Sequence, residues 1–265
     1  MTDFHSHSHY SFDGVEPCEK MVLAAIKKRI THLSLTDHLD ISPKGEPNIT
    51  LSNLKKYRQE LTALQEKYKD KIHLIAGIEI GYTKHNLQQI MDMALPLNFE
   101  FVINSIHDVG LEDCYLKEYF ANKTKAKAYG DYFEAVLESL SVPYPYHSVG
   151  HIGYVERKAT YPDTAIYYKD FASVLDEILK QIIAKEKILE VNVNCFGITT
   201  PHAPNREILE RYKDFGGNKV TFSSDAHTTD RLGCGFKMVK EVCSKIGFKG
   251  FTVFENGKEK FLAFD

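Results

Sequence analysis

Three histidines stand at every second position near the start of the chain, in the stretch TDFHSHSHYSFDG. They are His5, His7 and His9, and Asp13 follows in the same stretch. In a β-strand this spacing directs the three imidazoles to one face. Imidazole nitrogens and carboxylate oxygens are ligands for divalent transition metals. The stretch therefore predicts part of a metal site whose remaining ligands must come from elsewhere in the chain.

Imidazoles and carboxylates recur in the other apolar runs, mostly where each run ends. These runs are THLSLTDH, HLIAGIEIGY, EFVINSIHDV, YHSVGHIGYV and KVTFSSDAH. Burying one such group costs free energy unless it is paired or bound to a metal, and several that converge need a common partner. The candidate metal ligands are His5, His7, Asp13, His38, Glu79, His107, His151, Asp225 and His227.

The remaining polar candidates are weaker. The run ILEVNVNCFG offers only Asn192 and Asn194, so this strand is expected to lack a strong metal ligand. His9 points the same way as its two neighbours but lies further out. A group of other histidines at strand starts or on helices is expected to be structural or exposed: His32, His73 and His85.

The elements that must position these residues alternate between strands and helices. Amphipathic stretches with apolar residues three and four apart separate the apolar runs. They span residues 16–29, 51–69, 86–96, 129–140, 170–187, 206–215 and 238–246. Alternation of this kind predicts a parallel sheet covered by helices, with the site at the carboxyl ends of the strands. Seven such units without a linker favour a closed barrel. Residues 251–264 predict a terminal hairpin that turns at Asn256-Gly257.

Composition excludes several classes of partner. The chain has 265 residues, 43% of them apolar, and a net charge of −3, so we expect no nucleic-acid or membrane partner. No apolar run is long enough for a membrane helix, and the N-terminus does not resemble a signal peptide. The five cysteines are scattered and never form a C-x-x-C pair. Free thiols of this kind predict a cytoplasmic protein.

The ordered motifs DFHSHS, TDH, GIEIGY, SIH, GHIGYVER and SDAH resemble the successive signatures of the PHP (polymerase and histidinol phosphatase) family. Within that family they resemble the histidinol-phosphate phosphatases most. The resemblance covers essentially the whole chain. It implies a single domain over residues 1–265, folded as a distorted seven-stranded, TIM-like β/α barrel. It also implies two to three divalent transition metals, which the ligand types limit to Zn, Mn or Fe.

The resemblance implies a division of the ligands among three ions. The first ion would be held by His5, His7, Glu79 and Asp225, the second by Glu79 as a bridge with His107 and His151, and the third by Asp13, His38 and His227. Three places depart from the family pattern, one of which is the stretch NVNCFG in place of the more usual Asn-Thr-Ser/Ala-Gly. The other two are single positions. Asp13 stands where some relatives have histidine, and Gly153 stands where relatives commonly have aspartate. The departure at Gly153 bears on the choice of substrate.

The implied activity is hydrolysis of L-histidinol phosphate, a small-molecule phosphomonoester, in histidine biosynthesis. A hydroxide that bridges two metals would attack the phosphorus. Arg157 in GHIGYVER is the candidate for binding the phosphate, because a guanidinium can bind it with two parallel hydrogen bonds. Proton transfer or substrate contact is expected from Asp37, Asp108 or His202.

Three alternatives remain at this point. The same chemistry could act on another small phosphomonoester or on a nucleotide. The chain could be a metal-binding module without turnover. It could also resemble the amidohydrolases, which cleave C–N bonds, although those barrels usually have a lysine as the bridging ligand where this chain has Glu79.

Overall fold

The computed structural model describes residues 1–193, 202–255 and 257–264. Its main sheet is parallel throughout. The strands lie in the order β1 (Thr2–Asp3), β2 (His32–Leu35), β4 (His73–Gly81), β5 (Phe101–Ser105), β8 (Ser148–Val149), β9 (Ile188–Asn192) and β10 (Val220–Ser223). A further short strand, β3 (His38–Leu39), pairs with the far end of β4. These seven consecutive neighbours correspond to the seven predicted apolar runs.

The first and last strands of this sheet meet and close it. The backbone N–H of Phe4 donates to the carbonyl of Phe222 at 3.0 Å, and that of Asp225 donates to the carbonyl of His5 at 2.9 Å. This seam turns the sheet into a nearly closed barrel. The prediction of a distorted, seven-stranded TIM-like barrel is therefore confirmed.

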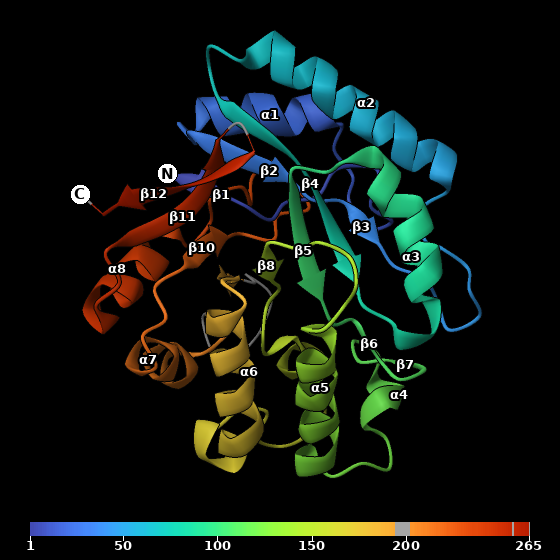
Figure 1. The fold of residues 1–265 in the computed structure, drawn as a ribbon, viewed down its shortest axis with the longest axis vertical. Coiled ribbons are helices and arrows are strands. Elements are labelled where there is room, and N and C mark those ends of the chain that lie inside the picture. Colours follow the sequence, from blue (N-terminus) through green and yellow to red (C-terminus); the bar gives the residue numbers. More distant parts are fainter. Residues whose placement is uncertain (194–201, 256, 265) are drawn as a thin grey trace.

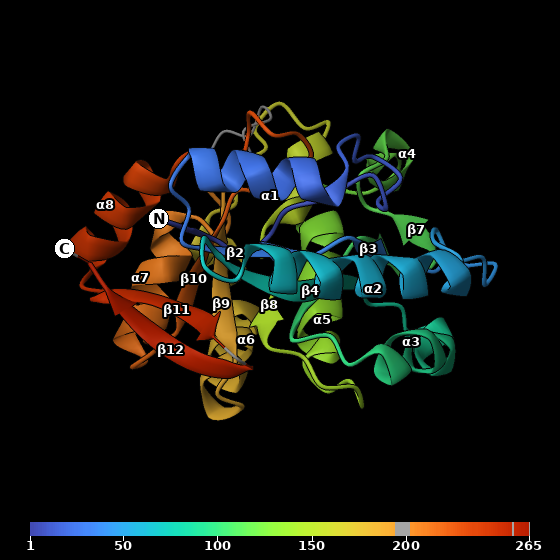
Figure 2. The same cartoon turned by 90° about the horizontal axis from the view of Figure 1, so that it is seen from above.

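Helices cover the outside of the barrel (Figures 1 and 2). They are α1 (Cys18–Lys27), α2 (Leu51–Tyr68), α3 (Leu87–Ala94), α4 (Lys117–Phe120), α5 (Lys125–Ser139), α6 (Ala172–Ala184), α7 (Arg206–Asp214) and α8 (Phe236–Ile246). Three of them begin at residues whose side chains accept a hydrogen bond from the first turn, namely Thr50, Thr124 and Asn205. Short 3₁₀ helices cover Lys84–Asn86, Leu95–Leu97, Tyr154–Lys158 and Tyr168–Asp170.

A C-terminal hairpin covers the end of the barrel at which the strands begin. It consists of β11 (Gly250–Glu255) and β12 (Lys258–Ala263), which pair in antiparallel fashion as predicted. The turn residue Asn256 lies outside the described residues. Val253 and Phe254 of β11 pack against Phe4, Ile75 and Phe101 in one buried cluster. The hairpin therefore supplies the apolar floor of the barrel.

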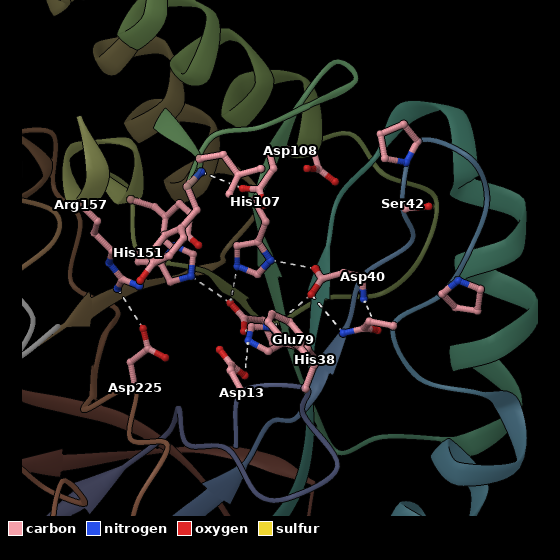
Figure 3. Close-up of a pocket in the computed structure, with 18 of the residues that line it drawn as sticks. Asp13, His38, Asp40, Ser42, Glu79, His107, Asp108, His151, Arg157 and Asp225 are labelled. Atoms are coloured by element: carbon pink, nitrogen blue, oxygen red, sulfur yellow. Dashed lines mark hydrogen bonds and ion pairs between the residues drawn. The ribbon is translucent and has the colours of Figure 1, made fainter. Parts of the chain in front are cut away.

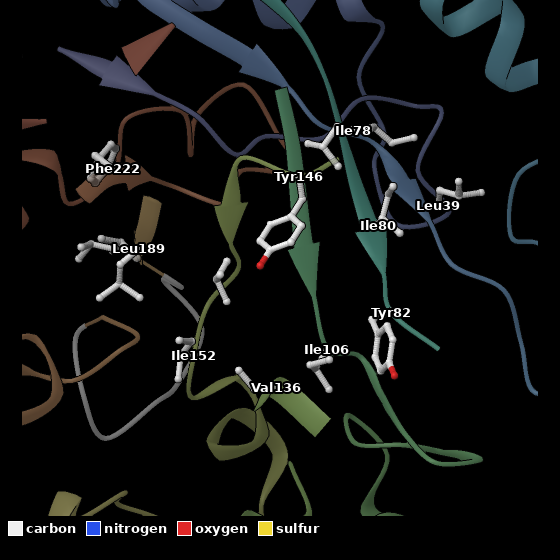
Figure 4. Packing of buried hydrophobic residues seen from close by; sticks show 14 of the residues in the cluster. Leu39, Ile78, Ile80, Tyr82, Ile106, Val136, Tyr146, Ile152, Leu189 and Phe222 are labelled. Atoms are coloured by element: carbon white, nitrogen blue, oxygen red, sulfur yellow. The ribbon is translucent and has the colours of Figure 1, made fainter. Parts of the chain in front are cut away.

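Side chains alternate between the two faces of each strand, and those that point into the barrel form an apolar floor at one end and a polar mouth at the other. In β4, Ile75 lies in the apolar floor and Glu79 on the same face lies at the mouth. In β9, Ile188 and Glu190 repeat this arrangement. A second, larger cluster of buried apolar side chains packs the barrel wall against the helices (Figure 4). The apolar core therefore surrounds the polar mouth without depending on it.

Two features of the fold have no counterpart in the predicted elements. A small hairpin, β6 (Asp108–Val109) with β7 (Glu112–Asp113), follows β5 and leads into the four-residue helix α4. Both lie beside the mouth of the barrel (Figure 1).

None of the described helices combines the length and the apolar character that crossing a bilayer requires.

Candidate metal centre

The carboxylate of Glu79 lies at the centre of a cluster of imidazoles (Figure 3). Its Oε1 is 2.9 Å from Nε2 of His151 and 3.2 Å from Nε2 of His107. Its Oε2 is 3.0 Å from Nε2 of His5 and 2.9 Å from Nδ1 of His38. The side chain of Glu79 is fully buried. One carboxylate thus faces four imidazoles from four different strands or strand ends.

The other carboxylates extend this cluster. Oδ1 of Asp225 lies 3.3 Å from Nε2 of His7. Oδ2 of Asp13 lies 3.0 Å from Nε2 of His227, and its Oδ1 lies 3.7 Å from Nε2 of His38. All nine predicted ligands therefore meet at the mouth of the barrel. Their division among three ions stays a prediction.

Local backbone geometry explains two of these positions. The pairing of β3 with β4 places His38 directly opposite Glu79. Asp225 has a φ of 54°, a left-handed conformation that aspartate adopts more readily than most residues. Beyond this bend after β10, Asp225 and His227 both face the mouth of the barrel.

Several buried polar atoms at this centre make only the close ion-pair contacts given above and no hydrogen bond of normal geometry among the described residues. They include Nε2 of His5, His7 and His227, Nδ1 of His38 and Oε2 of Glu79. Unpaired buried polar atoms are rare because each costs about 1–3 kcal/mol. Here the unpaired atoms are nitrogens and an oxygen that lie close together in one cluster. This set of ligand atoms fits divalent transition metals.

Outer hydrogen bonds fix the ligating nitrogens. Nδ1 of His5 lies 2.6 Å from Oε1 of Glu190, and a carboxylate can only accept, so the ring donates from Nδ1 and presents Nε2 to the centre. The second oxygen of Glu190 accepts the backbone N–H of His151. Nδ1 of His107 donates in the same way to Oδ1 of Asp40 at 2.8 Å.

A chain of hydrogen bonds holds His7. Nδ1 of His7 lies 3.0 Å from the hydroxyl of Ser11, which donates in turn to Oδ1 of Asp37 at 2.7 Å. Asp37 also accepts the backbone N–H groups of Ser8 and Ser11 and the hydroxyl of Ser8. Asp37 therefore anchors the loop that carries Asp13. It does not line the pocket, so its geometry favours anchoring over proton transfer.

The electrostatics of the cluster favour ionised carboxylates. Burial opposes the charge of Glu79, but His5, His38 and His107 outweigh it and hold the pKa of Glu79 well below its usual range. Burial acts against Asp13 as well, and His227 and His38 nevertheless lower its pKa to about 2. Carboxylates that stay ionised at neutral pH are ready to bind cations.

A pocket of about 860 Å³ opens over the centre. Glu79, His107, His151 and Asp225 form its base. The wall combines acidic residues with aromatic ones, namely Asp40, Glu46, Asp108, Asp113, Phe12, Tyr115 and Tyr154. A small molecule that carries a cationic group and a flat ring fits such a wall.

Arg157 lines this pocket from the 3₁₀ helix after β8. Its side chain is only 8% exposed, and its Nη2 donates to Oδ2 of Asp225 at 2.9 Å and to Oδ1 of Asn192 at 3.1 Å. The guanidinium lies 4.7 Å from the ring centre of Tyr154. Its Nε is buried without a hydrogen-bond partner among the described residues. Arg157 thus keeps donor capacity beside the metal centre.

The other predicted polar residues differ in whether they face the pocket. Asp108 lines the pocket, and burial, together with the charge of Asp113, raises its pKa to about 6. His202 is buried outside the pocket, with Nδ1 hydrogen-bonded to the carbonyl of Pro204 at 2.7 Å. His9 is exposed. The prediction for Asn194 lies outside the described residues.

Sequence comparison places the chain in a family. A model of the PHP domain matches residues 3–194, which is more than half of the chain. The chain belongs to the PHP family.

This PHP chain is 32% identical over 260 residues to the histidinol-phosphatase of Lactococcus lactis, in a match that covers 97% of the chain and 95% of that relative. It is 29% identical to a probable histidinol-phosphatase of Clostridium acetobutylicum, over 93% of the chain and 94% of the relative. The crystal structure of the Lactococcus lactis histidinol phosphate phosphatase, complexed with zinc, L-histidinol and phosphate, superposes with a TM-score of 0.86 at 30% identity, covering 98% of each chain. A putative histidinol phosphatase from Listeria monocytogenes, 17% identical with a TM-score of 0.78, shares the fold and covers 90% of this chain and 99% of that one.

Two residues that position the proposed ligands, Glu190 and Asp40, were not predicted from the sequence. Glu190 lies within the sixth run, two residues before Asn192 and therefore on the same face of β9. That alternation was a usable signal, and it shows that Asn192 and Asn194 are not the only polar candidates of this run. Asp40 directly follows β3, a strand of two residues that has no periodicity to detect, and so gave no comparable signal.

The backbone conformation explains why glycine, and not aspartate, stands at position 153. Gly153 has a φ of 123°, a conformation that side chains rarely adopt. It immediately precedes the 3₁₀ helix that carries Arg157. Glycine at this position therefore sets the direction in which Arg157 enters the pocket, and an aspartate would be strained there.

Proposed function

We propose that this protein is a divalent-metal-dependent phosphomonoesterase that hydrolyses L-histidinol phosphate to L-histidinol and phosphate in histidine biosynthesis. The observation that carries the proposal is the position of Arg157, which lines the same pocket as the converging ligands. The similarity to histidinol-phosphatases over nearly the full length of the chain supports the substrate.

We assign two to three ions of Zn, Mn or Fe to the nine ligands. The Lactococcus lactis structure is a complex with zinc, which makes zinc the first metal to test. When bound, such ions lower the pKa of a coordinated water and stabilise negative charge on a phosphoryl group. The ligands that would hold them are the imidazoles around Glu79, together with Asp13 and Asp225.

The protein's own groups bind and orient the substrate. Arg157 would donate to the phosphate oxygens from Nε and its terminal nitrogens, while Asp225 and Asn192 hold the guanidinium in place. Asp108 is the one of the three proposed proton-transfer candidates that faces the pocket. We therefore assign to Asp108 the contact with the oxygen of the leaving alcohol.

The acidic wall bears on the choice between substrates. L-Histidinol phosphate carries a cationic amine and an imidazole in addition to its phosphate. Asp40, Glu46 and Asp113 supply negative charge for the amine, and Phe12 and Tyr115 supply flat apolar surfaces for the ring. A nucleotide would bring further negative charge to the same wall, so we favour the smaller, cationic phosphomonoester.

The remaining alternatives fit less well. Glu79 occupies the place at which an amidohydrolase would have its bridging lysine. A module that only binds metal would not need a phosphate-binding residue such as Arg157 in the pocket. Because the ligands run from His5 to His227, we treat residues 1–265 as one catalytic domain. Cys18, Cys114 and Cys243 are buried free thiols, which suits a cytoplasmic enzyme.

The test is phosphate release by the purified, metal-loaded enzyme from L-histidinol phosphate and from a panel of other phosphomonoesters and nucleotides. We expect clear preference for L-histidinol phosphate and loss of activity with a chelator. Glu79→Gln keeps the volume of the side chain but removes its charge, and we expect turnover to fall at least ~10³-fold, or about 4 kcal/mol in the barrier. Circular dichroism and metal analysis of the same sample control for folding. A nucleotide as the best substrate, or full turnover without metal, would overturn the proposal.

A further inference from the structure

A second group of metal-binding side chains lies at the opposite end of the barrel from the centre described above. His32 is the first residue of β2, and His73 is the first residue of β4. The two strands pair in register, so that His32 lies directly opposite His73. Glu255, the last residue of β11, reaches them from the C-terminal hairpin. The group therefore joins three strands that are far apart in the sequence.

The three side chains point at one place. Nε2 of His32 lies 2.8 Å from Oε1 of Glu255, and Nε2 of His73 lies 3.9 Å from the same oxygen. The imidazole rings are stacked with an interplanar angle of 15° and centroids 4.6 Å apart. One ligand atom from each residue lies within 4.8 Å of the other two.

These distances are close to those of a zinc site. Zinc binds nitrogen and carboxylate oxygen at about 2.0–2.2 Å in a tetrahedron, which places ligand atoms about 3.3 Å apart. The observed separations lie on either side of that value, so small side-chain rotations would suffice. Two imidazoles and one carboxylate leave the fourth position to water, since no further ligand residue joins this group within the described residues.

Two neighbours prepare His32 for this role. Nδ1 of His32 lies 3.0 Å from the hydroxyl of Thr31, which itself donates to the carbonyl of Met1 at 3.2 Å. Without a metal, Nε2 of His32 donates to the carboxylate of Glu255, which can only accept. A zinc ion at Nε2 would shift the ring proton to Nδ1, where the hydroxyl of Thr31 can accept it.

A lysine occupies the place of the cation. Nζ of Lys260, on β12, lies 2.7 Å and 2.9 Å from the two oxygens of Glu255. The lysine side chain is 52% exposed, so it can swing into solvent. Without a metal, Lys260 supplies the positive charge that balances the carboxylate of Glu255.

We propose that His32, His73 and Glu255 form a second, peripheral site for one zinc ion, which competes with Lys260 and ties the C-terminal hairpin to the first residues of β2 and β4. The site is independent of the reaction at the barrel mouth. Since β11 supplies the apolar floor, an ion at this site would hold the hairpin against the strand starts and stabilise the folded enzyme.

The test starts from the zinc-loaded enzyme after removal of loosely bound metal, titrated with further zinc by calorimetry. We expect wild type to bind one more equivalent and His73→Ala to lose it or bind it at least ~10-fold more weakly. His85→Ala removes an exposed histidine outside the group and should behave as wild type. Lys260→Met removes the competing charge and should bind the extra zinc several-fold more tightly.

Thermal unfolding gives a second readout. The added zinc should raise the unfolding temperature of wild type and His85→Ala by a few degrees, and that of His73→Ala by clearly less. The side chain of His73 is 53% exposed, so its replacement should leave the fold and phosphate release unchanged. Wild type without an additional equivalent, or wild type and His73→Ala with equal affinity for it, would overturn the proposal.

Discussion

Glu190 shows how much depends on one carboxylate that touches no substrate. It holds His5 through Nδ1 and His151 through its backbone N–H, so it orients two proposed ligands on neighbouring sides of Glu79. In Glu190→Gln one oxygen becomes an NH₂ group that cannot accept, and the negative charge is lost. We expect zinc affinity to fall ~10–100-fold.

The measurement for Glu190→Gln is zinc affinity by competition with a chelating dye, together with kcat and KM at saturating zinc. Activity should recover at high zinc, because the residue positions ligands and does not take part in the reaction. Glu186→Gln, an exposed neighbour in the same segment, is the matched control. Unchanged zinc affinity in a folded Glu190→Gln enzyme would contradict the positioning role.

Arg157 gives the second prediction at this scale. Arg157→Met removes a charged donor from the pocket, and the loss of such a hydrogen bond to an ionised partner is worth about 1.5–3 kcal/mol, or ~10–150-fold. We expect KM for L-histidinol phosphate to rise by this factor and metal content to stay the same. The KM of Arg157→Lys should lie between those of wild type and Arg157→Met, because lysine keeps the positive charge but lacks the planar guanidinium.

Steady-state kinetics and metal analysis check the Arg157 variants. Lys158→Met is the control, since it removes an adjacent but exposed cation. If Arg157→Met and Lys158→Met had the same kinetics, Arg157 would have to be assigned to holding Asp225 alone.

At the scale of elements, most of the fold follows from local patterns in the sequence. The run HLIAGIEIGY predicts a strand because it is apolar and bounded by polar residues, and β4 covers nearly all of it. The ligands at strand ends were predictable for the same reason, since parallel strands bring their carboxyl ends together. The hairpin of β6 and β7 was not, because strands of two residues have no periodicity to detect. The turn of Asp225 into a left-handed conformation depends on contacts across the closed barrel and has no local signal.

His147, between α5 and β8, connects the stability of the barrel floor with pH. Its Nδ1 accepts the backbone N–H of Val102 at 3.0 Å, and its ring packs against Phe101 and Phe254. Burial, with a contribution from Lys187, lowers its pKa to about 4. The unfolded chain, with a pKa near ~6.5, takes up a proton first as the pH falls. This histidine therefore lowers the free energy of unfolding between about pH 6.5 and pH 4, by up to about 3 kcal/mol.

His147→Asn tests this effect, because the amide oxygen can still accept the hydrogen bond but does not titrate. We expect the variant to be less stable than wild type near pH 7, since it loses ring packing, and to lose less stability on acidification. Urea unfolding of both proteins across this pH range measures the two slopes. Parallel slopes would show that His147 is not the group responsible.

For the whole molecule, the metal centre should act as a clamp on the barrel. Its proposed ligands come from the first, middle and last strands of the sheet, and ions that bind only the folded chain stabilise it by about 4 kcal/mol at a thousand times their dissociation constant. We expect complete chelation to lower the unfolding temperature by roughly 10 °C. Differential scanning calorimetry with metal analysis before and after checks this, and added zinc should restore the original value. An unfolding temperature that did not move on verified metal removal would contradict the clamp.

The seam between the first and last strands also determines when in its own synthesis the protein can become an enzyme. His5 and His7 leave the ribosome well before Asp225, which is translated 220 residues later and whose backbone N–H donates to the carbonyl of His5. At 5–20 residues per second this interval is roughly 10–40 s. Throughout that time the histidine-rich strand has neighbours on one side at most, and no nascent chain that ends before His227 holds the complete set of ligands. Translation that stops before His227 therefore yields fragments that lack part of the metal centre, and we expect them to be unable to hydrolyse phosphate esters.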